Sequence, residues 1–213
     1  FLFSILYCIS ILTKWQPIVI FPFIAIYISE LNFNKINEIK NKNFNNVLNL
    51  RNLAQATSVV FLFILICSLT YGFLPIAKSF YVALKHTMIS GNALNFNWLI
   101  TWIIQLSDGT FVDRIIYRKI TSESPLYVYL GSIVFFTIFF FLIFSFANKK
   151  NRKIEDTYYY CAIALFAQFI FNKGEHQNHL FTSALFFLLL AIENKKFLIH
   201  SIITSIIFNL NLI

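Results

Sequence analysis

Long apolar blocks alternate with short polar connections along this chain. The blocks are Phe1–Leu12, Ile18–Ile28, Leu53–Phe73, Leu126–Ala147, Thr157–Phe171, Leu180–Ile192 and Phe197–Leu212. Their apolar residues are continuous and do not follow the spacing of one helix face, which is typical of helices surrounded by lipid or by other apolar helices. A crossing helix needs roughly 20 apolar residues, so about six or seven blocks and half-blocks predict membrane segments. We therefore predict an all-α fold, a polytopic transmembrane helical bundle.

Composition places the chain in the membrane class. Hydrophobic residues make up 58% of it and charged residues only 12%, whereas a soluble domain has about 25% charged residues. The net charge of +8 comes from basic residues in the short connections. Because no basic patch is interleaved with aromatic residues, nucleic acid is not an expected partner, and membrane lipids are. We predict a multi-pass integral protein of a bacterial inner membrane or the endoplasmic reticulum.

The basic connections predict which loops face the cytoplasm. Lys and Arg gather in 30–51, in 148–156 and at Lys195 and Lys196, and short loops rich in Lys and Arg stay on the cytoplasmic side. Residues 74–125 must then begin and end on the other side, as an external or lumenal region. Within it, "LNFNWLITWII" is expected to be re-entrant or interfacial.

This topology brings three polar clusters to the external face: "TKWQP" (13–17), "SGNALNFNW" (90–98) and "KGEHQNH" (173–179). We expect a single transmembrane domain over 1–213. The chain begins at Phe1 and its one methionine is Met88. We therefore expect it to be the C-terminal part of a longer chain.

The cluster at 173–179 has several interpretations. His176 and His179 are spaced to share a helical face, and histidine is a common metal ligand. No Cys or Asp completes such a set, so a metal is not indicated, although a divalent ion stays an alternative. Lys173, His176 and the Gln177 amide could instead bind an anion at the start of the next helix. The plain alternative is a solvated loop with interfacial histidines.

The other two clusters also have plain and functional interpretations. Lys14 and Gln16 would suit a phosphate or a sugar hydroxyl, although a lysine at the end of a membrane segment usually reaches toward the interface. Asn92, Asn95 and Trp98 repeat at three-residue spacing and can share one face. Amides pair with hydroxyls and an indole offers an apolar platform, although an interfacial amphipathic helix has the same pattern. Together the three clusters suit a ligand with a phosphate, hydroxyls and an apolar tail.

Three segments carry a resemblance to a known family. "TKWQPIVIFPF" resembles the Lys-x-Gln-Pro…Pro segment of GT-C type membrane glycosyltransferases. "SGNALNFNW" is similar to a Ser-x-Asn-Ala-x-Asn-x-x-Trp stretch of their mannosyltransferase-like members, and "GEHQNHLF" resembles their late Gly-x-His-Glu-x-x-Leu-Phe loop. The segments occur in the family's order and span most of the chain. Gln177 stands where the family usually has Glu, and a neutral amide can donate to phosphate but cannot act as a base.

The resemblance implies transfer of a hexose, with mannose expected, from a polyprenyl-phosphate donor to an acceptor on the external face. The acceptor is a glycan, a lipid or a protein. It implies no cofactor, and it implies a catalytic acidic residue in an external loop upstream of this chain, so no catalytic residue is assigned here. The expected substrate contacts are Lys14, Gln16, Asn92, Asn95, Trp98, His176, Gln177 and His179.

Two other classes of protein have similar patterns. A transporter or a non-enzymatic membrane assembly subunit could also combine broken helices with polar groups near one membrane face. No ionisable residue lies in the middle of a predicted span, where ion-coupled carriers tend to need one. A lipid-linked polysaccharide polymerase or ligase would be closer in chemistry and is expected to have a much longer external loop.

Overall fold

The computed structural model describes residues 16–30, 50–84, 90–91, 93–108 and 125–212, and these are mostly helical. The expected all-α class is confirmed at this level. The first apolar block, Phe1–Leu12, and most of the 30–51 connection lie outside the described residues. The chain divides into two compact units, one formed by Phe1–His86 with Ile143–Lys153 and the other by Thr87–Leu142 with Ile154–Ile213. The expectation of a single domain stays a prediction.

The described part of the first unit holds one 3-10 helix, three α-helices and the C-terminal end of a fourth α-helix. The 3-10 helix η1 (Gln16–Ile20) leads into α2 (Phe21–Ser29), and α3 (Leu50–Tyr71) is followed by α4 (Phe73–Leu84). Pro22 lies in the first turn of α2, where its missing N–H costs no hydrogen bond. Its neighbour Phe23 is fully buried and packs edge-on against Phe146, with ring centroids 5.8 Å apart.

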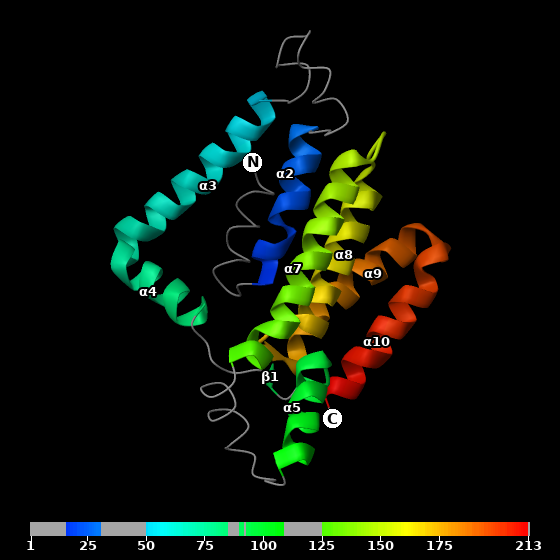
Figure 1. Cartoon of the computed structure of the whole chain (residues 1–213). Coiled ribbons are helices and arrows are strands. Elements are labelled where there is room, and N and C mark those ends of the chain that lie inside the picture. Colours follow the sequence, from blue (N-terminus) through cyan, green and yellow to red (C-terminus); the bar gives the residue numbers. More distant parts are fainter. Residues whose placement is uncertain (1–15, 31–49, 85–89, 92, 109–124, 213) are drawn as a thin grey trace. The chain divides into compact units, whose positions relative to one another are not determined.

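Gly72 separates α3 from α4. It has a φ of +83°, a backbone angle that glycine adopts at little cost. The axes of 60–71 and 73–79 are bent by 108° at this break, and the bend is visible in Figure 1. The predicted block Leu53–Phe73 is therefore helical up to Tyr71 and turns sharply there.

Arg152 caps the C-terminal end of α7 (Pro125–Asn148), the part of that helix that belongs to the first unit. Its guanidinium donates to the carbonyl oxygens of Phe146 and Ala147, at 3.3 Å each. These carbonyls belong to the last helical turn, where no intrahelical donor remains and a cation is favoured. Burial lowers the pKa of Arg152, and the negative charge of Glu30 partly offsets that effect.

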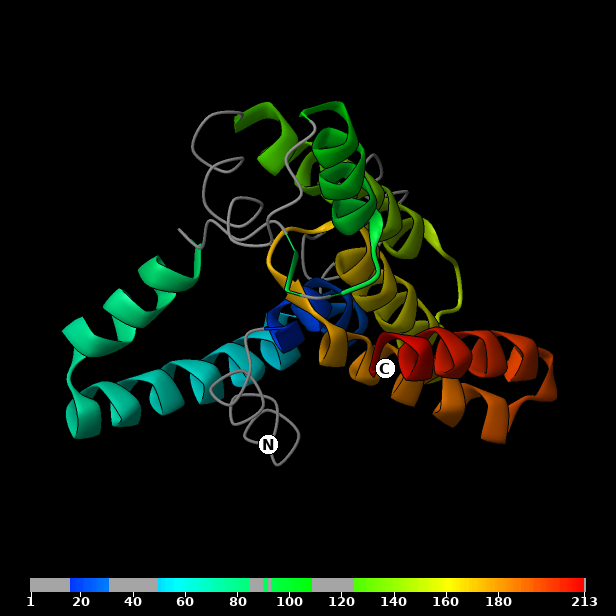
Figure 2. The ribbon, with the colours of Figure 1, turned by 90° about the horizontal axis from the view of Figure 1, so that it is seen from below.

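The second unit is built around three consecutive helices. They are α8 (Ile154–Phe171), α9 (Phe181–Glu193) and α10 (Leu198–Leu212), joined by the 3-10 helices η4 (Gln177–Leu180) and η5 (Lys195–Phe197). Helix α9 packs against both α8 and α10, and Figures 1 and 2 show α9 and α10 side by side in opposite directions. The expected tight turn at "ENKK" is present, where the Asn194 side chain accepts from the Lys196 N–H at 3.1 Å.

Side chains of this unit include buried polar groups and exposed apolar ones, beside a small apolar core that contains Phe169, Phe187 and Leu190. Helices α9 and α10 bury hydroxyls and an amide, whereas many of their leucines and isoleucines are exposed. The buried polar residues are Ser183, Ser201, Thr204 and Asn211. The exposed apolar residues include Leu185, Leu188, Ile192, Ile199, Ile202, Ile203, Ile206 and Leu210. Small and polar groups between helices with apolar groups outside are typical of helices in lipid.

One helix in the described part of the chain is long and apolar enough to cross a membrane, over Tyr129–Asn148. The bent pair 60–71 and 73–79 meets the same criterion only when taken together. Helix α7 has 24 residues, which is about 36 Å at a rise of 1.5 Å per residue and exceeds a hydrocarbon core of about 30 Å. Association with a membrane thus has support in one helix, and the six or seven segments stay a prediction.

Candidate functional site

Two of the three predicted polar clusters lie together in the second unit. Strand β1 (Ser90–Gly91) pairs in parallel with β2 (Glu175–His176), with Ser90 opposite Glu175 and Gly91 opposite His176. These strands have two residues each, so backbone pairing alone would hold them weakly. Side-chain hydrogen bonds from the "SGNALNFNW" segment supply the rest of the attachment.

Asn95 starts helix α5 (Phe96–Asp108) and ties it to α8. Its side-chain oxygen accepts from the Trp98 N–H at 3.0 Å, as an N-cap does. Its amide nitrogen donates to the Phe169 carbonyl oxygen at 3.0 Å. Asn95 was expected to contact the sugar or the lipid, and this expectation stays a prediction. In this structure its side chain is buried and bonded at both ends to backbone groups.

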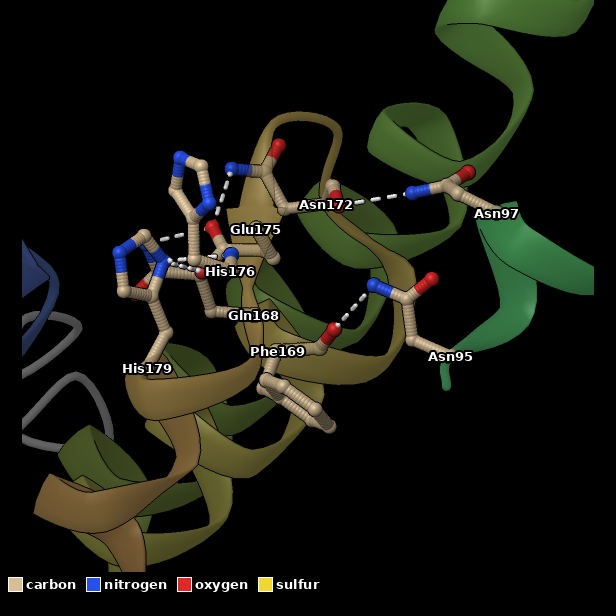
Figure 3. Close-up of polar contacts among 8 residues, drawn as sticks. All are labelled: Asn95, Asn97, Gln168, Phe169, Asn172, Glu175, His176 and His179. Atoms are coloured by element: carbon tan, nitrogen blue, oxygen red, sulfur yellow. Dashed lines mark hydrogen bonds and ion pairs between the residues drawn. The ribbon is translucent and has the colours of Figure 1, made fainter. Parts of the chain in front are cut away.

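Asn97 holds the C-terminal end of α8. Its amide nitrogen donates to the carbonyl oxygens of Phe171, at 2.9 Å, and Asn172, at 2.7 Å. These carbonyls lie at the end of the helix, where no following turn supplies backbone N–H donors. The Asn97 side chain donates to them instead. Asn97 is fully buried, and Figure 3 shows its amide directed at the turn after α8.

Helix α7 approaches this point through Gly131. A Cβ atom at residue 131 would overlap the Phe171 carbonyl oxygen and the Asn97 side chain. The adjacent Ser132 donates from Oγ to the Asn172 side-chain oxygen at 3.1 Å. Gly131 therefore permits a close approach that any larger residue would prevent.

Glu175 is the centre of a buried polar network. The residue is only 3% exposed, and its carboxylate is hydrogen-bonded to the side chains of Gln168, Asn172 and His179 among the described residues. Oε1 lies 3.1 Å from both the Gln168 and the Asn172 amide nitrogens, and Oε2 lies 2.7 Å from Nδ1 of His179. Figure 3 shows these side chains converging on Glu175 from α8, from the turn after it and from η4. Three donors offset much of the cost of burying a charged group.

The two histidines differ in exposure. The His179 side chain is 16% exposed and turned toward Glu175, while His176 is exposed. The rings lie 5.2 Å apart at 79°, and the His176 backbone N–H is 3.1 Å from the same Nδ1 of His179. His179 is thus tied to the buried network, and His176 stands at its outer edge.

Cationic and aromatic groups lie on the exposed side of the same unit. The Lys173 ammonium is 4.5 Å from the centroid of the Tyr129 ring, close enough for a cation–π contact. Trp98 is 41% exposed on α5, together with Leu99 and Trp102, and Leu94 just before the helix is also exposed. Trp98 and Trp102 are four residues apart and Leu99 and Trp102 are three apart, which places these three on one helical face. The expected platform around Trp98 is therefore an exposed apolar face.

The structure describes the other four predicted substrate contacts only in part or not at all. Gln177 lies in η4 and Gln16 lies in η1, and only their backbones are described. Lys14 and Asn92 lie outside the described residues. Lys14 and Gln16 belong to the first unit and the other predicted contacts to the second.

Four residues of the network were not predicted as a site: Asn97, Gln168, Asn172 and Glu175. The spacing of these residues could have indicated the network, because residues four apart are neighbours on a helix. Gln168 and Asn172 are four residues apart, and so are Glu175 and His179. Gln168 is also the only amide within the apolar block Thr157–Phe171. Its Oε1 is buried and has no hydrogen-bond donor among the described residues.

The described residues contain no group of three or more His, Cys, Asp and Glu side chains that could hold a metal. No protein-family model, curated protein or solved structure matches the chain.

Proposed function

We propose that the protein is a membrane glycosyltransferase that moves a hexose, with mannose expected, from a polyprenyl-phosphate donor to an acceptor on the external or lumenal face. The observation that carries this proposal is the junction of 90–98 with 172–179. The junction joins the segment that carries the exposed Trp98 to the loop that carries Lys173 and the exposed His176. Such a surface suits a ligand with a phosphate and an apolar tail.

The membrane location draws support from the exposed side chains. Helix α7 exposes Phe136, Phe140 and Phe141, each by at least half. Exposed apolar surface of this extent would be a liability in water and is expected in lipid. We extend this to a multi-pass protein, with the basic loop 149–153 in the cytoplasm and 172–179 on the opposite side.

Donor-phosphate binding is assigned to the loop after α8. His176 is exposed there, and Lys173 lies in the same loop with its ammonium over Tyr129. Charge-assisted hydrogen bonds to phosphate are about twice as strong as neutral ones. Gln177 completes the proposed set of donors in this loop, and Lys14 and Gln16 stay predictions from the sequence.

The sugar or lipid part is assigned to the exposed face of α5. Trp98 and Trp102 are four residues apart on it and both are about 40% exposed. An indole can lie flat against a sugar ring or along a prenyl chain, and tryptophan is favoured at the membrane interface. Because Asn95 caps this helix and binds Phe169, the face has a fixed position relative to the 172–179 loop.

In the proposed reaction, the bond between the anomeric carbon and the phosphate oxygen breaks and negative charge grows on the leaving phosphate. Positive and hydrogen-bonding groups at that position lower the barrier because they act more strongly on the transition state than on the ground state. His176 and Lys173 are the described residues best placed for this role.

The test uses the complete protein in proteoliposomes. Labelled polyprenyl-phosphate mannose and labelled nucleotide mannose are supplied separately to wild type, to His176→Ala and to His200→Ala. His200 is an exposed histidine on α10, so its variant is the matched control. We expect transfer from the lipid donor only, with a loss of about tenfold to a hundredfold in His176→Ala, since a hydrogen bond to a charged group contributes about 1.5–3 kcal/mol.

The control should retain wild-type transfer. Unchanged transfer in His176→Ala would remove the phosphate role of this loop while leaving the class of enzyme intact. Absence of transfer from either donor, across several hexoses, would reject the glycosyltransferase and favour a transporter or an assembly subunit.

A further inference from the structure

The contact between the Glu175 carboxylate and the His179 imidazole requires a shared proton. Oε2 and Nδ1 are 2.7 Å apart, the distance of a strong hydrogen bond. Two atoms that both presented lone pairs would repel each other at that distance. The proton therefore belongs either to the imidazole nitrogen or to a carboxyl group.

The other contacts of Glu175 favour the imidazole. Oε1 accepts from the amide nitrogens of Gln168 and Asn172, and an ionised carboxylate is purely an acceptor. Donors aimed at a carboxylate stabilise its charged form. The backbone N–H of His176, at 3.1 Å, would suit a lone pair on Nδ1, but the shorter contact with Oε2 would then be repulsive. We assign the proton to Nδ1 of His179.

This assignment determines what the outer edge of the ring can do. A neutral imidazole with its proton on Nδ1 has a lone pair on Nε2. Figure 3 shows the His179 ring with Nδ1 turned to Glu175 and the other nitrogen directed away from it. The side chain keeps 16% of its surface exposed. Nε2 is thus an acceptor at the border of the buried network.

We propose that Glu175 is a positioning residue that holds His179 in this tautomer, and that Nε2 of His179 accepts the proton of a substrate hydroxyl. The second part rests on the proposed function. As the acceptor oxygen attacks the anomeric carbon, its proton moves to Nε2 and the carbon–phosphate oxygen bond breaks. The phosphate leaves with the bonding electrons, and Glu175 stabilises the resulting imidazolium.

The two histidines then have different ligands. A lone pair on Nε2 of His179 would repel a phosphate oxygen and attract a hydroxyl. His176 is exposed and carries the proposed phosphate role. The pair of Glu175 and His179 can thus accept the proton of the substrate hydroxyl, and both residues lie in the described part of the chain.

The test is the substitution Glu175→Gln, because it alters the contact with His179 and can keep the contacts with Gln168 and Asn172. A glutamine can place its oxygen at the Oε1 position and keep both amide donors. Its NH₂ group then faces His179 and donates to Nδ1, which moves the imidazole proton to Nε2. Glu193→Gln, at an exposed glutamate that ends α9, is the matched control.

The first measurement is the ¹⁵N spectrum of the histidine-labelled complete protein at neutral pH, which separates the two neutral tautomers and the cation. We expect His179 to be neutral with a proton on Nδ1 in wild type and in Glu193→Gln, and to carry it on Nε2 in Glu175→Gln. Histidine variants assign the signals. A wild-type ring that is cationic or protonated only on Nε2 would overturn the proposal, and this result does not depend on how the variant folds.

The second measurement is transfer by the same proteins. We expect kcat to fall by about 10²–10⁴-fold in Glu175→Gln, the usual contribution of a general base, with little change in KM for the lipid donor. Equal kcat in wild type and Glu175→Gln would reject the proton-accepting role. If wild type shows no transfer, the proposed function fails, whereas the spectra still decide the tautomer.

Discussion

At the scale of single residues, two buried amides bind backbone: Asn95, for which the sequence suggested a ligand contact, and Asn97, which was not predicted as a site residue. Asn95 and Asn97 direct their side chains to carbonyl oxygens at the end of α8. Spacing alone could not distinguish a ligand contact from a structural one, because the same asparagine side chain can bind a sugar or cap a helix. The partner of Asn97 is 74 residues away in sequence, so only the tertiary structure reveals it.

Substitution of Asn97 should therefore act on stability. Asn97→Ala removes the donor to the two partly buried carbonyls of Phe171 and Asn172, and we expect a loss of about 1–3 kcal/mol. Asn97→Asp should cost more, because it adds a charged acceptor beside two carbonyl oxygens. Thermal unfolding in detergent measures both, with Asn209→Ala as control, since Asn209 is exposed and bonds within its own helix. Equal stability of all variants would contradict the bracing role of Asn97.

At the scale of elements, the apolar blocks predicted the helices well. The blocks at 126–147, 157–171, 180–192 and 197–212 correspond closely to α7, α8, α9 and α10. Block boundaries are clear because polar turns such as "ENKK" interrupt long apolar runs. The 3-10 helix η4 and the strand pair could not be predicted, since each is two to four residues long and depends on contacts from another segment.

The contact of α7 with the loop after α8 depends on Gly131. We expect Gly131→Ala to destabilise the protein, because the new Cβ overlaps the Phe171 carbonyl oxygen and the Asn97 side chain and a packed neighbour must move. Thr137→Ala, at an exposed position of the same helix, should change stability little. Comparing detergent-solubilised melting temperatures checks this. A Gly131→Ala protein as stable as the control would show that α7 does not constrain the loop.

At the scale of the whole molecule, topology in the membrane is the prediction with the widest consequences. The basic loop 149–153 is expected in the cytoplasm and 172–179 outside, so α8 must cross between them. Single cysteines at Lys150 and Asn178, both exposed, test this in a background without the three native cysteines. An impermeant maleimide should label Asn178→Cys in intact cells and Lys150→Cys only after permeabilisation. Labelling of both in intact cells would reject the proposed topology.

The bond between the Leu94 N–H and the Asn211 side-chain oxygen, at 2.6 Å, bears on how the protein is made. Its two residues are 117 apart, so the ribosome must complete nearly all of α10 before the segment that precedes α5 can be secured. Asn95 and Asn97 likewise wait for the carbonyls of 169–172. Earlier helices must form while these buried amides still lack their partners. Assembly of the 90–98 junction is therefore a late step of biogenesis, and a chain released before residue 211 would lack the bond that joins this junction to α10.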